Sequence, residues 1–323
     1  VGTQTDWTRL CESLPITPIS DETIGGRMVY SSGTTGKPKG AMHSHSSLVH
    51  TVRGYNTLVS QNSDDERMCF LPLCHIAERV GGEYHALYTG AKLNFVENPE
   101  TVPENVREIA PTVFTAVPRV WEKFYTGVMI TLKEAGTVKQ AAYSWGIGVG
   151  TQIADQVLAG QPVDGLLKFK FKVAKAIALN NVRKMIGIHN ARLLVTGAAP
   201  IAPDLIKWYL ALGVPMLEVW GMTETCGAST GMPPTRIKPG SIGPAASYNE
   251  VRIDEATGEI LVRGSKVFMG YLNLPEKTAE TSNFMQAEVD RLDAEVKELE
   301  TQIAVIKREN EGSLPELMPL NMQ

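Results

Sequence analysis

The alternation of hydrophobic and polar residues divides the chain into two regions. Up to about residue 284, short runs rich in β-branched and aromatic residues alternate with stretches of helical periodicity, separated by glycine and proline. The runs that predict strands are RMVYSS, RMCFLPL, AKLNFVE, TVFTAV, ARLLVTG, PMLEVW, EVRID and GEILVRG. The stretches that predict helices include PENVREIA, PRVWEKFYTGVMITLKEAG and APDLIKWYLALG.

This order of elements predicts an α/β fold. Strands that alternate with helices form layered, mostly parallel sheets that helices cover on both faces. The last two strand runs are joined by EATG and predict an antiparallel hairpin, so we expect the domain to end in a small β-rich lobe. We therefore predict one large α/β domain over residues 1–284.

The second region has a different, heptad pattern. Its apolar residues are spaced alternately three and four apart: Val289, Leu292, Val296, Leu299, Ile303 and Ile306. This pattern predicts a coiled-coil helix over 285–311 and favours a homodimer or a partner helix, although a single amphipathic helix lying on the domain is an alternative. Residues 312–323 are interrupted by proline, and we expect a flexible tail there.

Composition narrows the class of protein. The 323 residues carry a formal net charge of −4, which argues against a nucleic-acid binder. The sequence has no apolar run of about 18 residues, and its start lacks the features of a secretory signal. Its four cysteines have no CxxC spacing. We therefore expect an intracellular protein, cytoplasmic or on the surface of an organelle membrane, and not a secreted one.

The stretch YSSGTTGKPKGAMHSH, which begins at Tyr30, indicates a site for an anion. Its glycines let backbone N–H groups approach a ligand closely, and Lys37 and Lys39 add positive charge, a combination that suits the phosphates of a nucleotide. Pro38 follows Lys37 where the Walker A motif has Ser or Thr, so this is a different phosphate loop. A flexible linker is the alternative interpretation.

The same stretch resembles the phosphate loop of the adenylate-forming superfamily, which includes acyl-CoA synthetases, firefly luciferase and peptide-synthetase adenylation domains. Further similar segments follow in the family's order: LPLCHIAER, VTGAAP, VWGMTET and GEILVRGSKVFMGYLNLPEKT. VPRVWEKFY and the helical insert after it are most similar to long-chain fatty acyl-CoA synthetases. The resemblance covers nearly all of residues 25–280 and implies the large domain of an adenylate-forming enzyme.

The resemblance also implies a reaction. Such an enzyme is a long-chain fatty acid–CoA ligase, which forms an acyl adenylate from a fatty acid and ATP and then a thioester with CoA. It implies ATP and Mg²⁺ as cofactors, CoA as co-substrate and a fatty acid as substrate.

Particular residues are implied by the matching motifs. Nucleotide binding is implied for Ser31, Ser32, Gly33, Thr34, Thr35, Gly36, Lys39, Gly197, Ala198, Ala199, Trp220, Gly221 and Thr223. The resemblance makes Glu224 the Mg²⁺ ligand and places His75 where the acyl tunnel meets the reaction centre, so that Thr223, Glu224 and His75 are the implied catalytic residues. The residues alone also allow His75 to be a half-buried histidine beside a strand end, and Thr223 and Glu224 to form a strand-end cap.

The sequence departs from the family pattern after NLPEKTAETSNF. The family continues there to a Thr-Gly-Asp motif that binds ribose and to a small domain with a catalytic Lys, whereas this sequence continues into the heptad region. We therefore expect this chain alone to be inactive or impaired as a ligase. A non-catalytic interaction protein that dimerises through 285–311 is the alternative.

One basic segment has two interpretations. LLKFKFKVAKAIA, residues 166–178, places four lysines among apolar residues. It predicts either a solvated helix face or a peripheral contact with an anionic membrane surface.

Overall fold

The structure, a computed structural model, describes residues 27–31 and 39–281 of the chain. The chain divides into two compact units, one ending at Leu272 and the other beginning at Asn273. In the second unit, residues 275–281 are helical. The predicted coiled coil at 285–311, the tail at 312–323 and the boundary at 284 lie outside the described residues.

The strands follow the predicted order, with additions. Each of the eight predicted runs contains a strand, and three strands (β2, β8 and β11) were not predicted. In the described part of the chain the strands are β1 (Arg27–Ser31), β2 (Lys39–His43), β3 (Glu66–Cys69), β4 (Lys92–Phe95), β5 (Val113–Ala116), β6 (Leu193–Gly197), β7 (Met216–Met222), β8 (Gly227–Gly231), β9 (Glu250–Ile253), β10 (Ile260–Arg263) and β11 (Gly270–Tyr271).

The three predicted helices are present as α5, α6 and α10, and further helical segments accompany them. The α-helices are α2 (His45–Leu58), α3 (Ile76–Glu78), α4 (His85–Thr89), α5 (Val102–Ile109), α6 (Pro118–Glu134), α7 (Thr137–Leu158), α8 (Gly165–Ala174), α9 (Asn180–Ile186) and α10 (Pro203–Ala211). The π-helical turns are η1 (Arg79–Tyr84) and η3 (Lys175–Leu179), and the 3-10 turns are η2 (Pro99–Thr101) and η4 (Thr223–Thr225).

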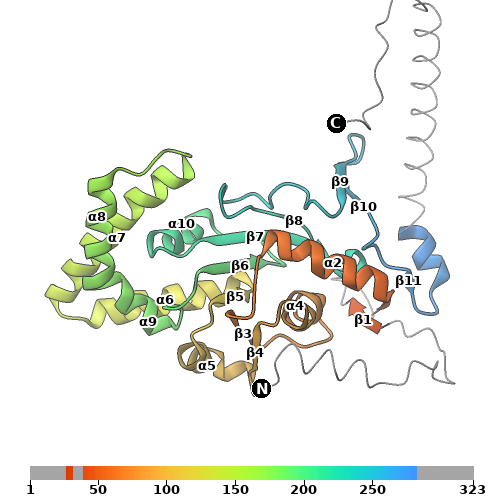
Figure 1. Cartoon of the computed structure of the whole chain (residues 1–323), viewed down its shortest axis with the longest axis horizontal. Helices are drawn as coiled ribbons and strands as arrows, with labels where there is room; N and C mark the ends of the chain where they lie inside the picture. The colour runs from red at the N-terminus through yellow and green to blue at the C-terminus, as the bar shows by residue number, and fades with distance from the viewer. Residues whose placement is uncertain (1–26, 32–38, 282–323) are drawn as a thin grey trace, which may run out of the picture. The chain divides into compact units, whose positions relative to one another are not determined.

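A four-stranded sheet in the order β5-β6-β7-β8 lies at the centre of the first unit (Figure 1). The pairs β5–β6 and β6–β7 are parallel, as the alternation of strands and helices predicts, whereas β8 is antiparallel to β7. The register of β7 against β8 shifts between Trp220 and Gly221. This irregularity falls inside the VWGMTET motif, where a β-bulge re-aims the side chains that follow.

Three smaller sheets accompany it. β3 and β4 are parallel, β9 and β10 form the predicted antiparallel hairpin, and β2 lies between β1 and β11 in an antiparallel sheet. The last of these sheets pairs β11 with β2, the strand that follows the segment predicted to bind phosphate. Two segments more than 200 positions apart therefore share one sheet.

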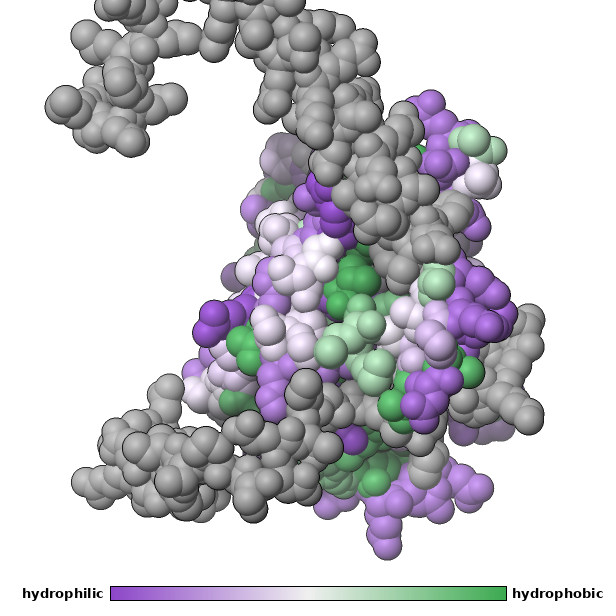
Figure 2. Space-filling model, turned by 90° about the vertical axis from the view of Figure 1, so that its right-hand side faces the viewer, coloured by the Kyte–Doolittle hydropathy of each residue, from purple (hydrophilic) through white to green (hydrophobic). Residues whose placement is uncertain are grey.

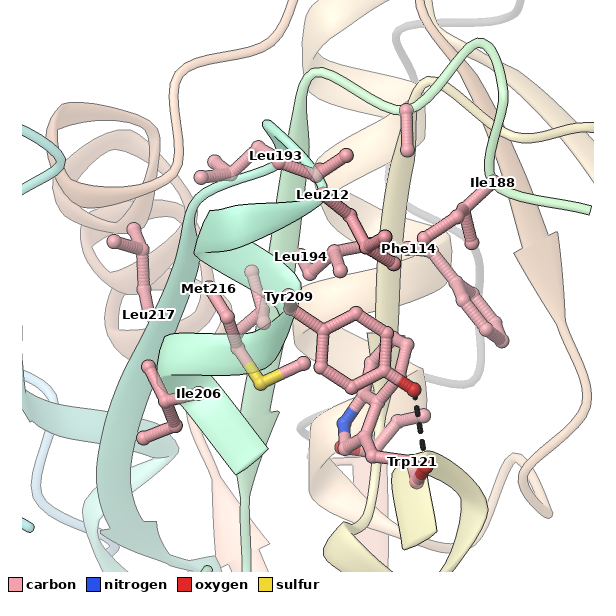
Figure 3. Close-up of a cluster of buried hydrophobic side chains, with 14 of the residues drawn as sticks. Phe114, Trp121, Ile188, Leu193, Leu194, Ile206, Tyr209, Leu212, Met216 and Leu217 are labelled. Carbon is pink, nitrogen blue, oxygen red and sulfur yellow. Dashed lines mark hydrogen bonds between the residues drawn. The ribbon is translucent and has the colours of Figure 1, made fainter. Parts of the chain in front are cut away.

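The core combines the central sheet with aromatic residues of α6 and α10. Trp121 is fully buried and makes edge-to-face contacts with Phe114 and Tyr209, with ring centroids 5.1 Å and 5.3 Å apart. The Tyr209 hydroxyl donates to the carbonyl of Trp121 at 3.0 Å (Figure 3). The Trp121 indole N–H donates to the carbonyl of Ala116 at 3.1 Å, so both buried polar groups are satisfied.

The long insert between β5 and β6 is helical, as its resemblance to the long-chain branch implies. α7 packs against both α8 and α10 and is drawn beside α8 in Figure 1. Gly150 of α7 lies so close to α10 that a Cβ there would be 2.1 Å from the carbonyl oxygen of Ala211. Among the described residues, no helix combines the length and hydrophobicity needed to cross a bilayer.

The side of the first unit that carries β11 has a mixed surface. Figure 2 shows hydrophobic residues gathered near the middle of this view, with hydrophilic residues around them. Met269 and Leu272, which flank β11, are 56% and 40% exposed. The apolar residues of this side are therefore not all in the core.

Candidate functional site

A cleft lies at the carboxyl ends of the parallel strands β5 and β6, which is where open α/β sheets bind ligands. Its volume is about 720 Å³, including the open solvent at its mouth. Its walls come from the end of β5, the end of β6, the middle of β7, the start of β8, α2 and the segment after β3. The lining residues are Thr51, Tyr55, Leu71, His75, Ile76, Ala77, Val80, Gly81, Thr115, Ala116, Val117, Gly197, Ala198, Val219, Gly221, Gly227 and Ala228.

At two of the positions predicted to bind the nucleotide, the backbone of a neighbouring strand comes so close that only glycine fits. A Cβ at Gly197 would lie 2.7 Å from the carbonyl oxygen of Val219. A Cβ at Gly221 would lie 2.0 Å from the carbonyl oxygen of Gly227, where β7 pairs with β8 at the bulge. Both glycines keep this wall of the cleft thin, so a ligand can approach bare backbone.

Glu224 is held from two directions by the segment around β11. The backbone carbonyl of Glu224 accepts a hydrogen bond from the N–H of Phe268 at 2.8 Å. Its side-chain Oε1 accepts from the Tyr271 hydroxyl at 2.6 Å, a charge-assisted contact. The turn that carries Glu224 is closed by the N–H of Cys226, which donates to the carbonyl of Thr223 at 3.0 Å. The carboxylate is therefore fixed at the end of β7.

Tyr271 also connects Glu224 to Lys39, which follows the segment predicted to bind phosphate. The ammonium of Lys39 lies 4.3 Å from the centroid of the Tyr271 ring, a cation–π distance. Lys39 pairs with Ser31 across β1 and β2, so these two residues bracket the loop of residues 32–38. The structure thus brings Lys39 over the ring of Tyr271 and Glu224 to the hydroxyl of the same side chain.

His43 is a buried polar residue near this group. It is fully buried, and burial lowers the pKa of its imidazole while nearby Glu224 opposes that shift. Within the described residues neither ring nitrogen makes a hydrogen bond of good geometry, although the Thr223 backbone lies near the ring. A buried imidazole with poorly satisfied nitrogens is uncommon, so His43 is a candidate site residue beside the Thr223–Glu224 turn.

His75 lines the cleft and also caps a helix. Its Nδ1 accepts a hydrogen bond from the N–H of Ala77 at 3.2 Å, so the neutral ring carries its proton on Nε2. The side chain is half-buried, and the described residues give Nε2 no hydrogen bond. His75 is thus half-buried and lines the cleft, where its Nε2 can donate to a ligand, and its implied catalytic role stays a prediction.

The other predicted residues have varied positions. Ala198 and Ala199 are exposed after β6, and Ala198 has a φ of 68° that turns the chain sharply. Trp220, Thr223 and Glu224 follow one another along β7 and η4 and are half-buried. Ser31 ends β1, whereas Ser32, Gly33, Thr34, Thr35 and Gly36 lie outside the described residues. The convergence of Thr35 and Glu224 on one nucleotide stays a prediction.

Tyr271, Phe268 and His43 are residues of this site that motif reasoning did not single out. Their sequence signal is weak, because Tyr271 and Phe268 lie in a segment that was matched to the family only as a whole. Their roles depend on pairing between β2 and β11, which no local pattern in the sequence indicates.

A further buried polar group contacts Thr115 of the cleft lining from behind. Arg67 on β3 is 2% exposed and donates to the hydroxyl of Thr115 at 3.1 Å, while its other terminal nitrogen lies 3.4 Å from Nδ1 of His85. Burial and the neighbouring Arg67 charge lower the pKa of His85 to about 3, so this histidine is neutral. The described residues give Arg67 no ion pair, and its charge lies behind the wall formed by Tyr55 and Thr115.

The residues present fit a magnesium ion that is held mainly by nucleotide phosphates. Among the described residues, no three His, Cys, Asp or Glu side chains gather around one point. Glu224 offers a single fixed carboxylate, since Tyr271 occupies only its Oε1. Mg²⁺ is usually bound through one or two carboxylates together with phosphate oxygens and water, which matches this donor set.

Comparison with known proteins identifies the family. Residues 27–272 match the family model described as AMP-binding enzyme. The chain belongs to the AMP-binding enzyme family. Its fold is therefore that of the adenylate-forming enzymes, as the sequence motifs imply.

Sequence relatives within this AMP-binding family are named as fatty-acid–CoA ligases. The provisionally named fatty-acid–CoA ligase fadD11 of Mycobacterium tuberculosis is 33% identical over 78% of this chain and 44% of that protein. The long-chain-fatty-acid–CoA ligase ACSBG2 of Xenopus laevis is 32% identical over 79% of this chain and 36% of that protein. The chain thus spans less than half the length of these relatives.

Solved structures share the fold of this chain. The ATP-bound structure of MatB from Rhodopseudomonas palustris aligns with a TM-score of 0.53 and 25% identity, covering 78% of this chain and 42% of that chain. The apo structure of MatB from the same organism gives a TM-score of 0.54 with 24% identity, covering the same shares.

Proposed function

We propose that this AMP-binding chain carries the nucleotide and acyl site of a long-chain fatty acid–CoA ligase. In that reaction a fatty acid and ATP form an acyl adenylate with release of pyrophosphate, and the CoA thiol then displaces AMP from the acyl carbon to form a thioester. The observation that carries the proposal is the connection of Lys39 and Glu224 through Tyr271, together with the cleft that Gly197 and Gly221 line. The names of the sequence relatives support the choice of acid.

The chemistry explains why these residue types are needed. The carboxylate of the acid must approach the α-phosphate of ATP, and both are anions, so charge neutralisation and alignment dominate the barrier. Lys39 would offset phosphate charge, and the Thr223 hydroxyl would donate to the α-phosphate. Mg²⁺, when bound at Glu224, would neutralise the charge that develops on the departing pyrophosphate.

The acyl chain would lie in the cleft beside His75. Most of the lining there is apolar, including Leu71, Ile76, Val80 and Val219. Burying a hydrocarbon chain against such residues gains about 0.8 kcal/mol per methylene group. His75 would stand where the chain meets the reacting carboxylate and could donate a hydrogen bond from Nε2.

Calorimetric titration of the full chain with Mg·ATP tests the proposal. We expect saturable heat, and we expect Glu224→Gln to weaken the affinity about tenfold, because a neutral amide is a poor ligand for Mg²⁺. Glu255→Gln, which neutralises an exposed glutamate in the turn between β9 and β10, is the matched control and should leave the affinity unchanged. Without saturable heat, a non-catalytic interaction protein that dimerises through 285–311 becomes the better explanation.

A further inference from the structure

Exposed apolar side chains form a stripe along α8 and η3. Leu166, Phe169 and Ile177 are 62%, 65% and 54% exposed, and half-buried Val173 lies between them. These four residues, which we call the α8 stripe, are spaced three, four and four apart, so they share one face of the helix. Single exposed apolar residues are ordinary, but an aligned set on one face indicates a contact surface.

The opposite face of the same segment is firmly packed. Leu167, Ala174, Ala178 and Leu179 are at most 9% exposed and lie on the buried side. Packing against α7 is close, since a Cβ at Gly146 would be 3.2 Å from the Cβ of Ala178. The exposure of the α8 stripe is therefore a fixed feature of a packed helix, which α7 supports from behind (Figure 1).

Positive charge accompanies the α8 stripe. Lys168, Lys170 and Lys172 are exposed on α8, and Lys184 is exposed on α9. The described residues give these four lysines no ion pair. No Asp or Glu occurs from residue 165 to residue 203, and the carboxylate of Asp164 accepts hydrogen bonds from the N–H groups of Leu166 and Leu167. The surface thus combines large apolar side chains with uncompensated cations.

The charge of this surface indicates which kind of partner it binds. A second copy of the chain would bring the same lysines against one another, which opposes pairing. An anionic lipid surface attracts juxtaposed lysines and also offers hydrocarbon for apolar side chains. Helices that lie in the plane of a membrane interface carry this combination of an apolar face and flanking basic residues.

We infer that the α8 stripe is a docking surface for an anionic lipid membrane. Leu166, Phe169 and Ile177 enter the boundary between headgroups and acyl chains, and Lys168, Lys170 and Lys172 contact the headgroup phosphates. The inference is independent of the proposed ligase function, because none of these residues lines the cleft. For a protein that takes a fatty acid, this contact would place the chain at the lipid phase from which the acid is drawn.

Vesicle flotation of the full chain tests the inference. We expect binding to phosphatidylcholine vesicles that contain about 30% phosphatidylserine, about tenfold weaker binding to phosphatidylcholine alone, and release as salt is raised to about 0.5 M. Phe169→Gln should reduce binding to the anionic vesicles about tenfold. Phe95→Gln is the matched control, because Phe95 on β4 is 64% exposed and lies on another element.

The lysines are tested separately. Replacing Lys168, Lys170 and Lys172 together by Gln should abolish the preference for anionic vesicles and leave the melting temperature unchanged, since all three side chains are exposed. Equal binding of Phe169→Gln and Phe95→Gln, or no binding of the wild-type chain to anionic vesicles, would overturn the inference. So would a dimer in solution that Phe169→Gln dissociates, because a second copy would then cover the α8 stripe.

Discussion

The hydroxyl of Tyr271 donates a 2.6 Å hydrogen bond to Oε1 of Glu224. Tyr271 also presents its ring to the ammonium of Lys39 at 4.3 Å, so one side chain positions a carboxylate and a cation at once. Both charged residues belong to motifs that imply contact with Mg·ATP. Under the proposed function, Tyr271 would therefore be a positioning residue, which acts on the nucleotide through Lys39 and Glu224.

Removing this hydroxyl should weaken the binding of nucleotide only when magnesium is present. In Tyr271→Phe the ring still faces Lys39, but the Glu224 carboxylate loses a charge-assisted hydrogen bond of about 1.5–3 kcal/mol and must be ordered by the ligand. We expect calorimetry to show about a tenfold weaker affinity for Mg·ATP and little change for ATP in EDTA. Tyr88→Phe, at a 52% exposed tyrosine, is the control. A loss of affinity that is equal with and without Mg²⁺ would show that Tyr271 acts only on Lys39 or on the fold.

His85 should make the chain sensitive to acid. Its pKa is about 3 in the folded state, mainly because of burial, against about 6.5 in the unfolded chain. As the pH falls below about 6.5, His85 binds a proton in the unfolded chain but not in the folded chain. The free energy of unfolding therefore falls by at most about 1.4 kcal/mol per pH unit. His85→Gln can keep both contacts, because its amide can donate to Asn56 and accept from Arg67.

We therefore expect urea unfolding between pH 6.5 and 4.5 to show a shallower loss of stability in His85→Gln than in the wild type. Some acid sensitivity should remain, because burial also lowers the pKa of His43. His50→Gln is the comparison variant, since the ring of His50 contacts the carbonyl of Tyr248 at 2.9 Å and is only partly buried. Identical pH profiles for wild type and His85→Gln would contradict the assignment.

The motifs and strand runs predicted more of the fold than of the site. All eight predicted strands were local hydrophobic runs, and each is present. β8 has the sequence GASTG, in which Thr230 is the one β-branched residue, and β11 has only two residues, so both exist because a neighbouring strand pairs with them. α2 begins with the N-cap Ser44, but its apolar residues are diluted by polar ones, and it was not predicted.

Residues of the candidate site could be predicted where they belong to a short sequence motif. They could not be predicted where their role depends on contacts between segments that are distant in the sequence. Gly197, Gly221, Thr223 and Glu224 could be named from short motifs that have their own backbone requirements. The contact of Tyr271 with Glu224 joins residues 47 positions apart, and nothing in either local pattern indicates the other. Arg67 could not be predicted as buried, because arginine in a strand is usually exposed.

Because of Lys266, the free energy of unfolding should rise as the pH is raised above about 7. It is fully buried against Ser229, Asn249 and the Ala228 carbonyl, and desolvation lowers its pKa to about 7 from about 10.5. Between these two values the unfolded chain holds a proton that the folded chain has lost, so the free energy of unfolding rises with pH. Burial raises the pKa of the neighbouring Cys226 thiol, which opposes this gain once an unfolded thiol begins to ionise near pH 8.5.

The effect of Lys266 on the free energy of unfolding can therefore be measured without interference from Cys226 between pH 7 and about 8. We expect the wild type to gain stability across this window, with a slope of up to about 1.4 kcal/mol per pH unit, and Lys266→Met to lose that slope whatever its baseline stability. Lys238→Met, which replaces an exposed lysine, should keep the wild-type slope. If Lys266→Met and wild type show the same slope in urea unfolding, the buried amine does not titrate there.

Two glycines of α7 should respond in opposite directions to the same substitution. Gly150 is buried, and an added Cβ would lie 2.1 Å from the carbonyl oxygen of Ala211, so Gly150→Ala forces α7 away from α10. Overpacking of this kind costs about 1–3 kcal/mol, which exceeds the gain in helix propensity. Gly148 lies two positions away with no atom within 4 Å of its added Cβ, so Gly148→Ala should stabilise the helix by about 0.5–1 kcal/mol. Thermal melting should therefore move down for Gly150→Ala and up for Gly148→Ala. A shift of both in the same direction would mean that α7 does not lie against α10 as the structure places it, and the position of the insert that carries α8 would then need revision.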